Sequence, residues 1–308
     1  MHLTLQQLKL FEAVTRHSSY TRAAEELHLT QPAVSIQIKR LEEQVGMALF
    51  EQVGKKIFPT AAGKAVYSAS VDILGRVAEL RSTVEALKGE VKGALQLAVV
   101  STTKYFMPHL LRSFLHTYPE VEPKLEFINR ARVVERLMNN EDDFVVMGQI
   151  PHEEGLAAYP FLENILGVVA PPGHPWTERK KIPLQDLVKE RFLQREPGSG
   201  TRLMFEQMLK KKGLKIEPYM ELSSSEAIKQ GVMAGLGVSI LSLHSLLLER
   251  NAGKLVVLDV EGFPFKRRWY AVHLQGKKLS LVAKTFLDYI LTESHRVLEM
   301  EQEEPGTS

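Results

Sequence analysis

The chain carries its most informative pattern near the start, in FEAVTRHSSYTRAAEELHLTQPAVSIQIKRLEEQVGMALFEQVGKKIFPTAAG, residues 11–63 of 308. Apolar residues recur at helical spacing up to Val14, and the polar run HSSYT separates them from a second periodic stretch, TRAAEELHL. Ser19 or Thr21 can cap a helix there, because a hydroxyl accepts a hydrogen bond from an amide at a helix start. Two short helices are therefore predicted before residue 30.

A third helix is predicted from Thr30, whose hydroxyl can cap it, with Pro32 in the first turn where its missing N–H costs nothing. Its apolar residues form a single stripe: Val34, Ile38, Leu41 and Val45. Its polar residues lie on the other faces: Gln31, Ser35, Gln37, Lys39 and Arg40. This layout is typical of a recognition helix, since Gln and Ser near its start can reach base edges and Lys and Arg can meet phosphates.

Residues 49–60, LFEQVGKKIFPT, predict a two-stranded ribbon that turns at Gly54. Lys55 and Lys56 lie at its tip, where they suit the phosphate backbone of DNA. A plainer alternative for the whole stretch is a small helical subdomain with ordinary capping. The order of three helices and a ribbon favours an N-terminal winged helix-turn-helix.

One long helix is predicted next, from about residue 60 to residue 88. Its apolar seam repeats every three or four residues: Val66, Ser70, Ile73, Val77, Leu80, Val84 and Leu87. Such a helix is roughly 40 Å long, too long to pack along its length on a domain of sixty residues. A helix buried within the chain is the alternative, but the narrow seam favours dimerisation, with Ser70 tolerated or specifying register.

From residue 93 the pattern changes to alternating strands and helices, which predicts an α/β fold. The expected strands are 95–100, 125–129, 144–147, 165–170 and 219–222, and the expected helices are 107–118, 133–139, 184–189 and one ending at residue 212; SSEAIKQGVMAGLGVSIL and a strand and helix within 269–292 complete the set. Two α/β lobes fit this length, with a ligand in the crevice at the carboxyl ends of the strands.

Three junctions are candidates to line that crevice. Ser101, Thr102 and Thr103 leave the first strand, where hydroxyls and unpaired amides favour an anion. The second is REPGSGTR, residues 195–202, which combines two glycines with two arginines able to hold phosphate or carboxylate but lacks the lysine of a Walker loop. The third is LSSSE, residues 222–226. Simple capping explains any one of them alone, and less readily all three together.

Composition narrows the class of protein. With 39 basic and 37 acidic residues, bulk charge does not indicate a nucleic-acid partner. The absence of cysteine excludes disulfide scaffolds, thiolate zinc sites and cysteine nucleophiles. No G-x-S-x-G elbow, paired-histidine motif or complete nucleotide loop is present, so we expect neither a catalytic site nor a metal. Without a membrane-length apolar run or a signal peptide, the chain is expected to be cytoplasmic.

Residues 11–63 as quoted resemble the LysR-type family of bacterial transcriptional regulators, and the resemblance extends to about Thr292. It implies that Gln31, Pro32, Ser35 and Lys55 lie against DNA, with Thr21 and Arg22 near the backbone; Gln37 and Lys39 complete the predicted DNA-binding set. Ile36 departs from the arginine that many members carry, so it either touches a thymine methyl or makes no specific contact. The C-terminal part is implied to be an effector-binding domain similar to periplasmic binding proteins, with two Rossmann-like lobes.

Within that family, STTKYFMPHLL, VVMGQIP, REPGSGTR and SSSEAIKQGVMAGLGVSIL are most similar to activators of Calvin-cycle operons encoding RuBisCO. Those regulators respond to anionic metabolites such as ribulose bisphosphate, phosphoenolpyruvate or NADPH. Gln149 and Ser225 depart from the subgroup, which commonly carries Arg and Asn there. The predicted effector-binding residues are Ser101, Thr102, Thr103, Gln149, Glu196, Gly198, Ser199, Gly200, Thr201, Arg202 and Ser225.

We therefore predict a DNA-binding domain over 1–60, a dimerisation helix and hinge over 61–92, an effector domain over 93–294 and an acidic tail over 295–308. The expected partners are an operator in double-stranded DNA, a small anionic effector, and a second copy of the chain. The resemblance implies a homotetramer and makes RNA polymerase a candidate partner; no cofactor is expected. The alternatives are a LysR-type regulator of another pathway, and an α/β ligand-binding protein or enzyme whose N-terminus does not bind DNA.

Overall fold

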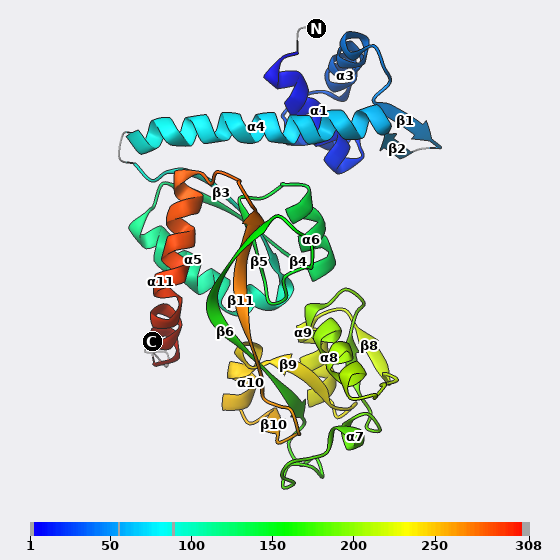
Figure 1. The fold of residues 1–308 in the computed structure, drawn as a ribbon, viewed down its shortest axis with the longest axis vertical. Helices are drawn as coiled ribbons and strands as arrows, with labels where there is room; N and C mark the ends of the chain where they lie inside the picture. The colour runs from blue at the N-terminus through cyan, green and yellow to red at the C-terminus, as the bar shows by residue number, and fades with distance from the viewer. Residues whose placement is uncertain (1–2, 55, 88–89, 304–308) are drawn as a thin grey trace. The chain divides into compact units, whose positions relative to one another are not determined.

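The computed structural model describes residues 3–54, 56–87 and 90–303, and the chain divides after residue 89 into two units. The first unit begins with three helices, α1 (Leu5–His17), α2 (Tyr20–Glu26) and α3 (Gln31–Val45) (Figure 1). Hydroxyl side chains cap all three: the Thr4, Ser19 and Thr30 side chains accept from the amides of Gln7, Arg22 and Ala33. Ser19, not Thr21, caps the second helix.

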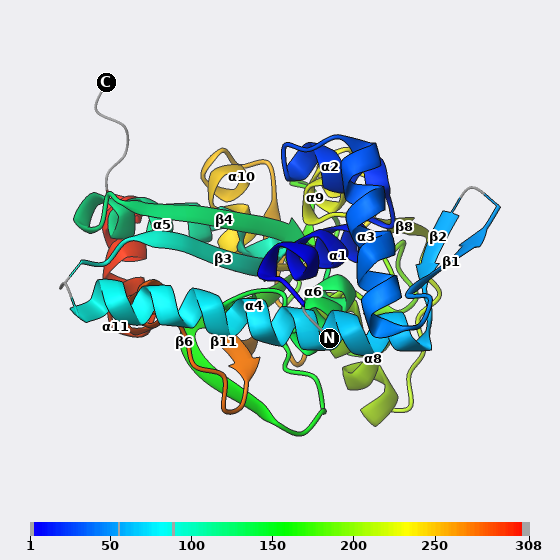
Figure 2. The same cartoon turned by 90° about the horizontal axis from the view of Figure 1, so that it is seen from above.

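The apolar stripes predicted from the sequence meet in one small core. Its fully buried members include Leu10, Phe11, Val14, Val34, Ile38, Leu41 and Leu49. The hairpin β1 (Phe50–Val53) and β2 (Lys56–Pro59) follows α3, paired antiparallel and turning through Gly54, whose φ of 64° suits glycine. Figure 2 shows this hairpin projecting beyond α3 as a wing. Lys55 lies outside the described residues.

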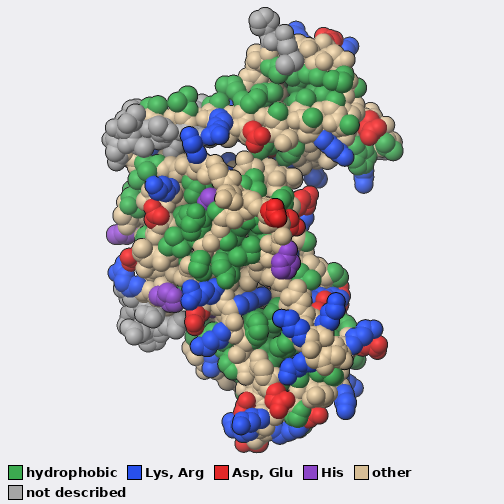
Figure 3. All heavy atoms as spheres, in the orientation of Figure 1, with side chains coloured by type: hydrophobic (Ala, Val, Ile, Leu, Met, Phe, Trp, Pro, Cys, Tyr) green, Lys and Arg blue, Asp and Glu red, His purple; other side chains and the backbone are tan. Residues whose placement is uncertain are grey.

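Helix α4 (Ala61–Leu87) runs as one element, as its seam predicts. Near its start Val66 and Tyr67 pack against the core of the first unit, and buried Ser70 donates from Oγ to the Val66 carbonyl at 2.7 Å. Further along, the seam residues are exposed: Ile73 is 42%, Leu80 64% and Val84 46% accessible, and Figure 3 shows apolar side chains along the helix. The second half of α4 therefore presents an apolar seam that this unit does not cover.

The second unit is built on one mixed sheet and a short separate one. The main sheet has the order β10 (Val256–Leu258), β6 (Leu156–Ala170), β11 (Phe265–Leu274), β5 (Phe144–Met147), β3 (Gly93–Val100), β4 (Val121–Ile128), with β9 (Ser239–Ser242) also paired to β6. The separate sheet is β7 (Leu193–Arg195) with β8 (Met220–Leu222). The helices are η1 (Ser101–Tyr105), α5 (Met107–Thr117), α6 (Arg130–Met138), α7 (Leu184–Leu187), α8 (Gly200–Lys211), α9 (Ser225–Met233), η2 (Leu243–Leu246), α10 (Leu247–Asn251) and α11 (Leu281–Glu303).

This unit has two lobes (Figure 1). The hydrophobic core of the first lobe surrounds β3, β4 and β5, and includes Phe106, Phe114 and Trp269. The second lobe has two hydrophobic clusters, one around α8 and the far end of β6 that includes Leu166 and Phe205, and one that includes Leu193 and Ile228. The long strands β6 and β11 run through both lobes, and their pairing shifts register between Trp269 and Tyr270. The predicted α/β fold with two lobes is confirmed.

Several element boundaries differ from the expectation: the strand predicted over residues 125–129 spans Val121–Ile128, and the helix predicted over 133–139 spans Arg130–Met138. The strand predicted over residues 165–170 begins at Leu156, because Pro160, usually a sign against a strand, is accommodated opposite Tyr270. The last helix continues past Thr292 to Glu303. In the described part of the chain no helix is long and apolar enough to cross a membrane.

Candidate DNA-recognition surface and effector pocket

The exposed face of α3 carries the polar residues predicted to read DNA. Gln31, Pro32 and Lys39 are exposed, and Ser35 and Gln37 are half-buried at the flanks of the buried stripe. Ile36 is 54% exposed on the same helix. Because the apolar side is fixed in the core, the helix can offer only this polar face to a groove.

Neighbouring elements supply groups suited to the DNA backbone. Thr21 and Arg22 are exposed in the first turn of α2. On the wing, Lys56 is exposed, and so are two apolar side chains that sequence reasoning did not single out, Val53 at 64% and Phe58 at 42%. In β2, exposed and partly buried residues alternate, a pattern that could have indicated Phe58, whereas β1 is exposed from Glu51 to Val53 and gives no such signal for Val53.

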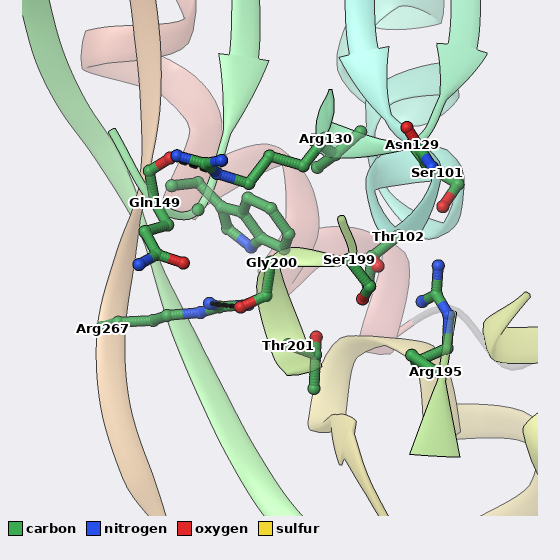
Figure 4. A pocket seen from close by; sticks show the side chains of 13 residues that line it. Ser101, Thr102, Asn129, Arg130, Gln149, Arg195, Ser199, Gly200, Thr201 and Arg267 are labelled. Atoms are coloured by element: carbon green, nitrogen blue, oxygen red, sulfur yellow. Dashed lines mark hydrogen bonds between the residues drawn. The ribbon is translucent and has the colours of Figure 1, made fainter. Parts of the chain in front are cut away.

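In the second unit, carboxyl ends of parallel strands converge on one pocket. β3 pairs in parallel with β4 and β5, so their ends at Val100, Ile128 and Met147 point to the same edge. The pocket encloses about 340 Å³, including its open mouth. Its lining is Val100, Ser101, Thr102, Asn129, Arg130, Gly148, Gln149, Arg195, Ser199, Gly200, Thr201, Arg267 and Trp269 (Figure 4).

Three helical elements begin at this pocket, namely η1, α6 and α8. Asn129 caps α6 by accepting from the Arg132 amide at 3.2 Å, and Ser199 is the N-cap of α8. The first amides of a helix lack intrahelical partners and carry partial positive charge. The hydroxyls of Ser101, Thr102, Ser199 and Thr201 form no hydrogen bond within the described residues. The pocket therefore offers hydroxyl groups and helix-start amides as hydrogen-bond donors to a ligand.

Two arginines bring full positive charge into the pocket. Arg267 projects from β11, where it donates to the Gly200 carbonyl at 3.3 Å; the Asn164 carboxamide, with its oxygen facing the guanidinium, accepts from Nε at 2.9 Å. Arg130 donates from Nε to the Gln149 carbonyl at 3.0 Å. Among the described residues neither arginine forms an ion pair with a carboxylate.

The electrostatic cost of this arrangement appears in the pKa values. Burial lowers the pKa of Arg267 to about 10, and the neighbouring Arg130 charge lowers it further. Burial also lowers the pKa of Arg130, which the Glu153 carboxylate partly offsets. A buried cation without a partner is unfavourable, so both groups are poised to accept an anion.

Glycine makes the close packing around Arg267 feasible. A Cβ on Gly148 would lie 3.1 Å from the Trp269 ring and 3.3 Å from Cζ of Arg267. A side chain at position 148 would therefore displace the guanidinium that faces the pocket.

Not every residue predicted to bind an effector lines this pocket. Six do: Ser101, Thr102, Gln149, Ser199, Gly200 and Thr201. Thr103 is buried, and its hydroxyl donates to the Val100 carbonyl at 2.9 Å. Arg202 turns along α8 and pairs with Glu206 at 2.8 Å and Glu221 at 2.6 Å.

Glu196, Gly198 and Ser225 also lie outside the lining, and Glu196 and Ser225 contact the buried Arg195. Glu196 holds Arg195 through two contacts of 2.7 and 2.9 Å, and Ser225 accepts from its Nη1 at 2.8 Å. The carboxylate neutralises Arg195, which leaves Arg130 and Arg267 as the arginines of the lining that form no ion pair within the described residues.

Sequence reasoning missed Asn129, Arg130, Arg267 and Trp269. Asn129 and Arg130 directly follow the end of β4, a position that marks ligand sites in α/β sheets. In β11 the residues Phe265, Arg267 and Trp269 share one face, so a cation among inward-facing aromatics was a readable signal. Within the described residues no cluster of three or more acidic or histidine side chains could hold a metal ion.

A winged helix-turn-helix joined to a two-lobed domain with a cationic pocket defines a ligand-responsive DNA-binding regulator. Residues 5–64 match the family of bacterial regulatory helix-turn-helix proteins of the lysR type, and residues 88–294 match the LysR substrate binding domain. The chain belongs to the LysR family of bacterial transcriptional regulators, as the sequence resemblance predicted, and this family consists of regulators and not enzymes.

Relatives and solved structures show which members of the LysR family this chain is similar to. The chain is 47% identical to the RuBisCO operon transcriptional regulator of Acidithiobacillus ferrooxidans over 95% of each chain. It is also 47% identical to the HTH-type transcriptional activator CmpR of Synechocystis, over 96% of this chain and 97% of the relative. The regulatory domain of CcmR from Synechocystis, solved in complex with 2-PG, is 42% identical, with a TM-score of 0.64 over 66% of this chain and 98% of that domain.

Proposed function

We propose that this regulator controls carbon-fixation genes, activating a RuBisCO operon when a small phosphorylated metabolite binds between its lobes. Its likeness to RuBisCO operon regulators supports the target genes. The observation that carries the effector class is the pair of partly buried guanidinium groups, Arg130 and Arg267, which face one pocket without forming an ion pair to a carboxylate within the described residues. An anion placed between them would relieve an electrostatic cost that the empty pocket bears.

The rest of the lining favours phosphate over a simple carboxylate. The N-termini of α6 and α8 offer amides, and four hydroxyls are free to donate. A phosphate has enough acceptor oxygens to use several of these donors at once, whereas a carboxylate has two. This supports a bound phosphate held by Ser101, Thr102, Ser199 and Thr201 together with the arginines.

Candidate effectors are ribulose bisphosphate, phosphoenolpyruvate, NADPH and, from the complex of the Synechocystis relative, 2-phosphoglycolate. Thr103, Glu196, Gly198, Arg202 and Ser225, although predicted to bind the effector, are better suited to support Arg195 and the surrounding loops.

On DNA, the proposal assigns base contacts to Gln31, Pro32 and Ser35, with Gln37 and Lys39 flanking them. Thr21, Arg22 and Lys55 would contact the backbone. Their exposure on one helix face and on the start of α2 supports this assignment, except for Lys55, which lies outside the described residues. Two copies of α3 on adjacent turns would match a palindromic operator.

The proposal includes a homodimer formed through α4 and a tetramer built from two dimers. The exposed seam of Ile73, Leu80 and Val84 supports the dimer, since a long apolar stripe at heptad spacing is stable only when covered. The tetramer and a contact with RNA polymerase follow from family resemblance alone. A cytoplasmic location and the domain boundaries 1–60, 61–92, 93–294 and 295–308 complete the proposal.

A mobility-shift titration on the DNA upstream of the gene, with and without each candidate metabolite, tests this function. We expect specific binding that one phosphorylated metabolite alters. Specific binding unaffected by every candidate would favour a LysR-type regulator of another pathway. Loss of specific binding on all promoter fragments would contradict the assignment of α3 as a recognition helix.

A further inference from the structure

Two buried polar atoms at the pocket lack any hydrogen-bond partner. In the described part of the chain four buried side-chain atoms are without one: Gln149 Oε1, Gln194 Oε1, Trp269 Nε1 and Tyr289 OH. Gln149 and Trp269 both line the pocket, and the other two residues do not. Gln149 Oε1 is an acceptor without a donor, and Trp269 Nε1 is a donor without an acceptor.

Gln149 is held so that its amide oxygen stays unused. Its backbone carbonyl accepts from Arg130 at 3.0 Å, which fixes the residue at the end of β5. Its Nε2 donates to Gln207 of α8 at 3.4 Å. Figure 4 shows the carboxamide oxygen turned toward Gly200. The Gln149 carboxamide therefore has its donor, Nε2, bonded to Gln207 and its acceptor, Oε1, buried without a partner.

Trp269 is equally constrained. It is 1% exposed, its ring lies 5.5 Å from the Phe106 ring, and the Arg267 guanidinium lies 5.9 Å from its centroid. Aromatic neighbours fill its apolar surface but offer nothing to the indole N–H. A buried indole usually finds an acceptor, so the free Nε1 points to a missing group.

An ionised phosphate or carboxylate alone cannot complete this pair, because it has acceptors only and would repel the amide oxygen. A hydroxyl group has one donor and two acceptor lone pairs, which match Gln149 Oε1 and Trp269 Nε1 respectively. We infer that the effector carries a hydroxyl besides its phosphate, and that Gln149 and Trp269 select for that hydroxyl. This inference rests on the proposed function, since it describes the ligand of the same pocket.

The test compares two ligands that differ by one hydroxyl, 3-phosphoglycerate and 3-phosphonooxypropanoate, by calorimetric titration of the full chain. Leaving a buried polar group unpaired weakens binding by roughly 5- to 150-fold, so we expect the hydroxylated ligand to bind at least about tenfold more tightly. Equal affinity for the two would overturn the inference while leaving the anion site intact. Binding of neither ligand, nor of inorganic phosphate or 2-phosphoglycolate, would overturn the proposed function itself.

Variants assign the preference to these residues. Gln149→Met should reduce the preference to about twofold or less, and Trp269→Phe should reduce it while keeping the ring. Gln194→Met is the matched control, because Gln194 also has a buried orphan oxygen, donates to Glu206 at 2.9 Å, and lies outside the lining. It should keep the full preference. A preference that survived in both Gln149→Met and Trp269→Phe would show that other residues read the hydroxyl and would overturn the assignment.

Discussion

Helix α3, the proposed recognition helix, and the candidate effector pocket both present polar and cationic side chains, but one set is exposed and the other is partly buried. On α3, polar and cationic side chains lie on one short segment, Gln31 to Lys39, and are largely exposed. In the pocket, the cations Arg130 and Arg267 come from segments more than a hundred residues apart and are desolvated. The residues of a DNA-binding helix can follow one another in the sequence. The residues of a metabolite pocket come from distant segments and meet only when the chain folds.

The two settings also differ in what they cost the folded protein. An exposed lysine on α3 is solvated and screened, so it is nearly neutral for stability until DNA arrives. Arg267 is buried beside a second cation, and its lowered pKa reports that strain. Anion binding should therefore raise the stability of the effector domain, by an amount that grows with the logarithm of the anion concentration relative to its Kd.

The largest effect is expected from breaking the α4 seam. Leu80→Asp together with Val84→Asp places charge on the exposed apolar stripe and should convert the proposed dimer to a monomer. Because paired binding multiplies affinity by about 10² to 10⁴, operator affinity should fall by at least about 100-fold. Effector binding should persist. Light scattering and mobility shifts measure both, and a dimer that survived the double change would contradict the seam assignment.

Replacing Arg267 should weaken phosphate binding without lowering the thermal midpoint of the ligand-free protein. In Arg267→Met, phosphate affinity should fall at least about 30-fold, because a desolvated charge partner is lost. The thermal midpoint of the ligand-free protein should stay the same or rise, since an unpaired buried charge is removed. Arg179→Met is the control, because Arg179 pairs with Asp186 at 2.7 Å on the surface. A large loss of stability in Arg267→Met would argue against an uncompensated charge.

On α3, Gln31→Ala should weaken binding to the specific operator, whereas Lys39→Ala should weaken binding to every DNA sequence. Loss of a base contact at Gln31 should cost about 1–3 kcal/mol on the specific operator and little on random DNA. Loss of a phosphate contact at Lys39 should weaken binding on all sequences and reduce the salt slope by about one. Fluorescence anisotropy on both kinds of DNA at several salt concentrations separates these effects. Identical losses on both DNAs for Gln31→Ala would contradict a role in base reading.

The smallest effect concerns the N-terminal domain's own stability. Hydrogen bonding to Arg16 lowers the pKa of Glu26 to about 2, against the smaller opposing effect of burial, and His17 also contributes. A lowered folded pKa gives stability that is present above the unfolded value, near 4.5, and lost as pH falls toward 2. Glu26→Gln should cost less than about 1 kcal/mol near neutral pH, because the pair is partly exposed, and a smaller amount at pH 2, where the folded carboxylate is about half protonated. Denaturant titrations at both pH values check this.

The same contrast explains what could be predicted from the sequence. The start of α3 at Gln31, the turn at Gly54 and the extent of α4 follow from caps, stripes and heptads, which are local. Pro160 hid the first half of β6, because only its pairing with β11 shows that the proline is tolerated.

The pocket was predictable only in part. Hydroxyl and glycine junctions pointed to Ser101, Thr102, Ser199, Gly200 and Thr201, which the fold brings together. The charges were harder to predict, because Arg195 pairs with its neighbour Glu196, whereas Arg202 pairs with Glu206 on α8 and Glu221 on β8. Which arginines remain uncompensated depends on tertiary contacts, and no linear pattern encodes those.

The central claim is that anion binding at Arg130 and Arg267 changes how the N-terminal domain binds its operator. The most direct measurement titrates operator DNA with wild type and Arg267→Met, each with and without the phosphorylated effector, in one mobility-shift or anisotropy series. We predict that the effector changes wild-type binding and leaves the variant unchanged, while both bind the operator equally without effector. An undiminished effector response in Arg267→Met would contradict the claim.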